Sequence, residues 1–140
     1  MDYRAPQPDA PLLVLSTRVT ALNRHTGALV WTYEVDAATR RFAIEGERLF
    51  VFDGNGRLHC LELRTGRLIG RVDLGLSQAN SMLVDGDRMY VSNDSTVIAL
   101  DLNGQILWRA DVPANGSYSL CGLGVPGGHL VQPDFSNRPG

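Results

Sequence analysis

Short apolar runs alternate along the chain with turns rich in glycine, asparagine and aspartate. In the clearest stretch, the runs predict strands at about 81–84, 88–92, 96–102 and 105–112. The turns between them are Asp85-Gly86-Asp87, Asn93-Asp94-Ser95 and Asn103-Gly104. An Asn-Gly or Asp-Gly pair between apolar runs indicates a hairpin, because both central residues of such a turn take positive φ angles. No segment has the length and 3.6-residue period of a helix, so the pattern predicts an all-β fold.

The chain also repeats itself with a fixed period. Three segments superpose when the chain is aligned with itself, and they begin at Ala21, Cys60 and Ala99, each 39 residues after the last. A second landmark agrees, because residues 46–51 match residues 86–91, with a fainter echo at 128–131. Two landmarks with nearly the same period indicate a repeat architecture.

The third run of each repeat is apolar on both faces. One face carries Val19 and Ala21, Leu58 and Cys60, or Val97 and Ala99; the other carries Leu22, Leu61 or Leu100. A strand with two apolar faces must be covered on both sides, unlike a strand of a sandwich, which usually has one wet face. Four-stranded antiparallel units that are covered on both faces and repeat at this spacing predict β-propeller blades, about three in this chain.

The copies resemble the pyrroloquinoline-quinone-type propeller repeat, whose signature is Ala-x-Asp-x-x-Thr-Gly followed four residues later by Trp. The matching positions are Ala21, Thr26, Gly27 and Trp31 in the first copy, Thr65 and Gly66 in the second, and Ala99, Asp101, Gly104 and Trp108 in the third. The resemblance covers roughly residues 11–131 and implies a propeller. The same repeat serves quinoprotein dehydrogenases, an outer-membrane assembly scaffold, and many sensors and scaffolds.

The resemblance also implies how the blades pack. The repeat glycine forms the turn between the third and fourth strands, where positive φ is required. The tryptophan of the fourth strand is expected to pack over that turn and against the next blade. The second copy has Gly70 in place of the tryptophan, so we expect a weaker contact between blades there.

Net charge and the search for targeting signals limit the partners and the compartment that we expect. The net charge of −2 argues against nucleic acid or an anionic membrane as the main partner. All 13 basic residues are arginine, a bias typical of a high-GC bacterial genome. Residues 1–9 lack the apolar segment of a secretory signal, and the longest apolar run is too short to cross a membrane. With only Cys60 and Cys121 in the chain, we expect reduced thiols and a cytoplasmic protein, although a chain trimmed of its signal would look the same.

The sequence contains few residues that could form a catalytic, cofactor or metal site. No vicinal cysteine pair and no Asp/Asn/Glu cluster for calcium is found, so a quinone dehydrogenase is not expected. The histidines are His25 in a turn, His59 within a strand and His129 at a strand start, and no two have metal-ligand spacing. Cys60 takes the place of an alanine and is expected to be buried, whereas Cys121 lies in a glycine-rich stretch. We therefore expect no catalytic, cofactor-binding or metal-binding residues.

The alignment also predicts how the chain is divided. An N-terminal extension (1–10) precedes a partial propeller (11–132) and a flexible tail (133–140). The blade units are expected at about 11–37, 41–75 and 80–113, with a partial blade at 118–132. The first unit lacks a first strand and the last unit supplies a spare one, so we expect a second copy to close the ring head-to-tail, giving about six blades. The alternative is closure by another propeller-bearing chain, or a chain that is part of a longer propeller.

Two functions compete at this stage. The first is a non-catalytic scaffold or protein-interaction module. The second is a ligand-binding or enzymatic ring whose site forms at the central channel of the oligomer. First strands line such a channel, and the channel candidates are Arg40, Arg41, Asn80, Ser81 and Ser117.

Overall fold

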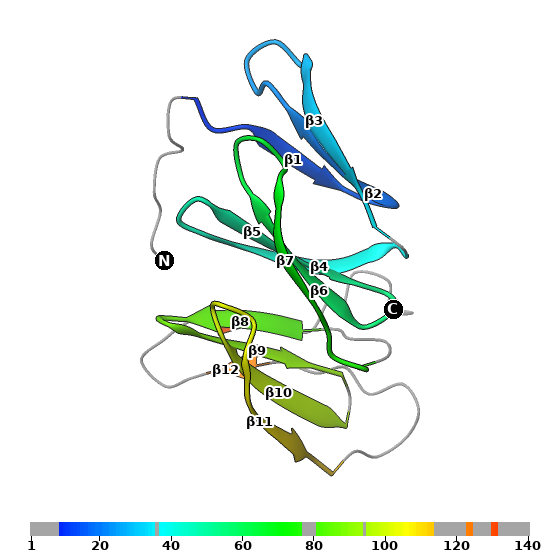
Figure 1. The fold of residues 1–140 in the computed structure, drawn as a ribbon, viewed down its shortest axis with the longest axis vertical. Helices are drawn as coiled ribbons and strands as arrows, with labels where there is room; N and C mark the ends of the chain where they lie inside the picture. The colour runs from blue at the N-terminus through cyan, green and yellow to red at the C-terminus, as the bar shows by residue number, and fades with distance from the viewer. Residues whose placement is uncertain are drawn as a thin grey trace, which may run out of the picture.

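The computed structural model describes residues 9–35, 37–76, 81–93, 95–113, 123–124 and 130–131. These residues form thirteen strands in four antiparallel sheets (Figure 1). The prediction of an all-β fold built from four-stranded antiparallel units is confirmed. Within this part of the chain, no helix has the length and apolarity needed to cross a membrane.

The strands follow the repeat. The first sheet contains β1 (Leu12–Leu15), β2 (Arg18–Leu22) and β3 (Leu29–Glu34). The second contains β4 (Thr39–Glu45), β5 (Arg48–Asp53), β6 (Arg57–Glu62) and β7 (Leu68–Asp73). The third contains β8 (Ser81–Asp85), β9 (Arg88–Ser92), β10 (Thr96–Asp101) and β11 (Ile106–Asp111), and a small fourth sheet contains β12 (Leu123–Gly124) and β13 (Leu130–Val131).

Each full sheet is a meander in which strands pair in chain order, from β4 to β7 and from β8 to β11. The first strands β4 and β8 contact each other across the space between the sheets. In Figure 1 the first three sheets follow one another down the long axis of the molecule, from blue through green to yellow. The first sheet has three described strands, which correspond by the repeat to strands two to four of a blade.

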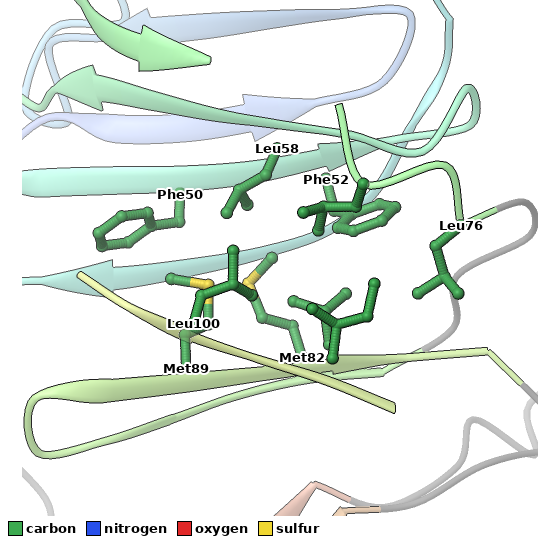
Figure 2. Close-up of a cluster of buried hydrophobic side chains, with 10 residues drawn as sticks. Phe50, Phe52, Leu58, Leu76, Met82, Met89 and Leu100 are labelled. Carbon is green, nitrogen blue, oxygen red and sulfur yellow. The ribbon is translucent and has the colours of Figure 1, made fainter. Parts of the chain in front are cut away.

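The hydrophobic cores lie between neighbouring sheets. One cluster joins the first sheet to the second through Val19, Ala21, Trp31, Leu49, Val51, Leu61 and Leu63. Another joins the second to the third, and Figure 2 shows Phe50, Phe52 and Leu58 facing Met82, Met89 and Leu100 across it. The two apolar faces of each repeat therefore pack on different neighbours, as expected for a propeller.

Candidate functional site

The contact between the first and second sheets is centred on an indole ring. Trp31 is 8 % exposed, and its Nε1 donates a hydrogen bond to the backbone oxygen of Leu63 at 3.1 Å. A Cβ atom placed on Gly66 would lie 2.5 Å from Cδ2 of Trp31. The tryptophan therefore packs over the glycine turn of the next repeat, and not over the turn that precedes its own strand.

Strand register defines an equivalent row of three residues in each of the first three sheets. The rows are Leu13–Ala21–Trp31, Phe50–Cys60–Gly70 and Tyr90–Ala99–Trp108. Directly paired residues lie on the same face of a sheet. The first row packs towards the second sheet, and the second row lies on the face towards the third. The middle row differs because its inner residue is a phenylalanine and its outer residue has no side chain.

The contact between the second and third sheets is built differently as a result. An open cavity of about 200 Å³ lies beside Gly70, where the first contact holds an indole. The backbone oxygen of Leu102, equivalent to that of Leu63, accepts a hydrogen bond from Nη1 of Arg48 at 3.0 Å. A guanidinium thus supplies the hydrogen bond that an indole supplies one repeat earlier.

Cys60 lines this cavity and is half-buried. Burial raises the pKa of its thiol, and the nearby Arg48 charge offsets part of that rise. A thiol with a raised pKa is a poor nucleophile near neutral pH. The expectation of a buried structural cysteine holds in part, because the side chain also borders an open space. Cys121 lies outside the described residues.

A chain of polar side chains is buried at the first contact. Nε2 of His59 lies 2.7 Å from Oδ2 of Asp53, and the two side chains are 1 % and 0 % exposed. The hydroxyl of Tyr33 lies 2.8 Å from Nδ1 of the same ring. A carboxylate only accepts hydrogen bonds, so Nε2 donates to Asp53, and Nδ1 of the neutral ring accepts from Tyr33.

This polar chain has a structural role in the turn as well. Oδ1 of Asp53 accepts from the backbone N–H groups of Asn55 and Arg57 at 2.9 and 3.1 Å. The positions equivalent to His59 are Thr20 and Ile98, so the other repeats contain no such histidine. The arrangement resembles a proton relay, but Asp53 and His59 are fully buried, out of reach of a substrate. We infer that it fixes the geometry of the first contact.

This cluster was not predicted from the sequence, although the sequence carries a signal for it. An aspartate that ends a strand and a histidine six residues later in the paired strand lie close together whenever a tight hairpin joins them. His25, by contrast, is exposed in a turn, as expected. His129 lies outside the described residues.

The channel candidates are not brought together by the described structure. Arg41 is half-buried on β4, and Ser81 is fully buried on β8. The side chain of Arg40 is not described, and Asn80 and Ser117 lie outside the described residues. Among the residues that are described, no group of three or more histidine, cysteine or acidic side chains is placed to hold a metal ion.

The outer strands carry a repeated apolar feature. Each begins with two exposed aliphatic residues, which are Leu29 and Val30 on β3, Leu68 and Ile69 on β7, and Ile106 and Leu107 on β11. These six residues, here called the rim pairs, are between 40 % and 64 % exposed. Isolated exposed apolar residues are ordinary, whereas a repeated row of them marks a contact surface.

Comparison with known proteins gives a consistent result. A sequence model of the family described as outer membrane protein assembly factor BamB matches residues 16–127. The BamB of Escherichia coli strain K12 is 30 % identical over 105 residues, which cover 65 % of this chain and 26 % of that protein. The crystal structure of BamB from Moraxella catarrhalis superposes with a TM-score of 0.64 at 26 % identity, over 77 % of this chain and 34 % of that one.

Enzymes share the fold at lower similarity. A europium-containing methanol dehydrogenase superposes with a TM-score of 0.59 at 19 % identity, over 73 % of this chain and 23 % of the enzyme. Likeness at that level concerns the fold alone. The predicted resemblance to the pyrroloquinoline-quinone-type repeat is therefore confirmed, with assembly factors rather than enzymes among the curated relatives.

The expected cytoplasmic location is wrong. The curated relatives are outer membrane protein assembly factors, a task that places them outside the cytoplasm. The expectation rested on the first nine residues and on two cysteines. The chain spans about a quarter of the length of the curated relatives it matches, so its first residues carry no information about export.

Proposed function

Because the chain belongs to the family described as outer membrane protein assembly factor BamB, we propose that its blades serve as a protein-interaction scaffold in the assembly of outer membrane proteins. The observation that carries this proposal is the row of rim pairs. Outer blade strands have one free backbone edge, and exposed aliphatic residues along such an edge suit an added strand of a partner protein.

The rim pairs give the test of this function. Changing Leu68 and Ile69 to serine in the full protein should lower the amount of outer membrane protein assembled in the source cells, because an apolar contact is removed. The control is Thr32→Ala, an exposed change on the outer strand β3 that leaves every rim pair in place. Protein levels are followed by immunoblot. Unchanged assembly in the double variant, at normal protein levels, would contradict the proposal.

We also infer how the ring is closed. Trp108 is 42 % exposed, whereas the equivalent Trp31 is 8 % exposed against its glycine turn. The Gly27 turn is open, because a Cβ atom placed on this glycine would have nothing within 4 Å. One open end thus presents an unpacked tryptophan and the other an uncovered glycine turn, which are the two halves of the contact seen between Trp31 and Gly66.

Further exposure supports an added strand at the first blade. Phe42 and Ile44 are each 50 % exposed, and they pair with Val51 and Leu49, which face the first sheet. They lie where a first strand of that blade would cover them. We propose that this strand and the cover for Trp108 come from more blades of the same kind, with a second copy of the chain as the simplest source.

The mass of the particle in solution tests closure by a second copy. Light scattering should give twice the chain mass, and Trp108→Ala should shift the particle towards a monomer because the contact across the two ends is lost. Thr32→Ala, an exposed change on β3, is the control. A stable soluble monomer would rule out closure by a second copy and favour closure by further blades of a longer chain.

A further inference from the structure

The cavity between the second and third sheets has a defined shape and chemistry. Its lining includes Phe50, Leu58, Cys60, Gly70, Leu102 and Arg48, and we call it the Gly70 notch. Phe50 and Leu58 are nearly fully buried and form an apolar floor. Gly70 is exposed on the outermost strand, so the notch opens to solvent at the rim.

The same place in the preceding contact holds an indole. Trp31 there lies over the positive-φ Gly66 and donates to the oxygen of Leu63. The second contact keeps part of the receiving side, because Gly104 has a φ of +87° and the oxygen of Leu102 takes the place of that of Leu63. Val72 packs over the Gly104 turn, since a Cβ atom on Gly104 would lie 2.9 Å from its Cγ2, and Arg48 already donates to the oxygen of Leu102, so an added ring would lie beside these two side chains. The residue that would supply the ring also differs, since Gly70 stands where the first repeat has its tryptophan.

The walls favour an aromatic group over an aliphatic one. Nη1 of Arg48, which lines the notch, is held by its hydrogen bond to the oxygen of Leu102. A planar guanidinium in a fixed position attracts the face of an aromatic ring, and indole most strongly. The volume of about 200 Å³ has room for one such ring system, since a closed cavity of about 150 Å³ is known to hold benzene.

We propose that the Gly70 notch binds an aromatic side chain, with indole the best fit, presented by a partner protein. This deepens the proposed scaffold function, because the notch lies beside Ile69, a member of one rim pair. A partner strand along β7 would bring its own side chain to the position where Trp31 and Trp108 stand in the other blades. Backbone hydrogen bonds to β7 would accept a partner strand of almost any sequence, and the notch would make the contact selective for strands that carry an aromatic residue.

The probe for this site is N-acetyl-L-tryptophanamide. A single ring binds weakly, with a dissociation constant on the order of millimolar. Bound in the notch, it should cover the Cys60 thiol and slow its alkylation by iodoacetamide severalfold at saturation. Labelling of Cys60 is read by peptide mass spectrometry of the full chain, at alkaline pH because the thiol has a raised pKa. N-acetylglycinamide at the same concentration is the control and should not slow it.

Two variants sharpen the result. Gly70→Trp should slow Cys60 labelling without any probe and remove the effect of the probe, because the new indole fills the notch. Arg48→Met should weaken the protection, because it keeps the stem but removes the guanidinium. Equal labelling rates with the tryptophan and glycine probes overturn the proposal, whether or not the variants fold. Because Ile69 also borders the notch, the same double change at the rim pair Ile106 and Leu107, which does not border it, tests the scaffold proposal separately, and that proposal can survive a failure here.

Discussion

Replacing Gly66 with alanine is expected to destabilise the protein by about 2 to 6 kcal/mol. The residue has a φ of +74°, and holding a side chain in that region costs about 1 to 3 kcal/mol. The added Cβ would also lie 2.5 Å from the Trp31 ring, so the indole must shift away from the turn. Such overpacking typically costs about 1 to 3 kcal/mol. Urea denaturation followed by tryptophan fluorescence measures the change.

Gly27→Ala is the matched control for this experiment. Its φ of +77° is nearly the same, but nothing lies within 4 Å of a Cβ at this position. Only the backbone strain applies, so the expected loss is about 1 to 3 kcal/mol. The difference between the two variants isolates the contact with Trp31. Equal losses would mean that the indole does not depend on a bare turn.

Removing the carboxylate of Asp53 is expected to cost about 2 to 6 kcal/mol. Asp53→Ala leaves the buried Nε2–H of His59 without an acceptor, which costs about 1 to 3 kcal/mol. It also removes the acceptor for the N–H groups of Asn55 and Arg57, each a bond of net worth about 0.5 to 1.5 kcal/mol. The free energy of unfolding from chemical denaturation is the readout.

Asp53→Asn should be much milder, with a loss of about 1 kcal/mol, the net worth of a typical hydrogen bond. Its amide oxygen still caps the turn, and its amide nitrogen can donate to Nε2 of His59. The ring proton then moves to Nδ1 and is donated to the hydroxyl of Tyr33. Nitrogen-15 NMR of the ring should show Nε2–H in the parent chain and Nδ1–H in the variant. An unchanged tautomer would contradict this account of the polar chain.

The sequence predicted the fold because the repeat carries its own alignment. The landmarks at Ala21, Cys60 and Ala99 place every blade strand, and the positive-φ glycines fall where the turn pattern requires them. The partner of the tryptophan was less accessible, since the alignment shows which residues are equivalent but not which blade each one touches. That Trp31 lies over Gly66 follows from blade stacking in space.

The sites escaped prediction for a related reason. Aligning the repeats detects residues that recur at the same position. The polar chain of Asp53, His59 and Tyr33 occurs once among the described residues and joins two repeats, so the alignment does not reveal it. The role of Arg48 is likewise visible only in the structure, where its guanidinium makes the hydrogen bond that an indole makes in the preceding contact. The substitution of Gly70 was visible in the sequence and predicted a weak contact, but its chemistry depends on the neighbouring blade.

The cores of this protein lie between its sheets. The unit that a gene duplication copies, one blade, is therefore smaller than the unit that can fold, which is at least two neighbouring blades. Duplication of a 39-residue stretch of gene copies one blade, yet a lone blade would have both apolar faces in water. A newly duplicated blade is therefore useful only when inserted beside an existing one.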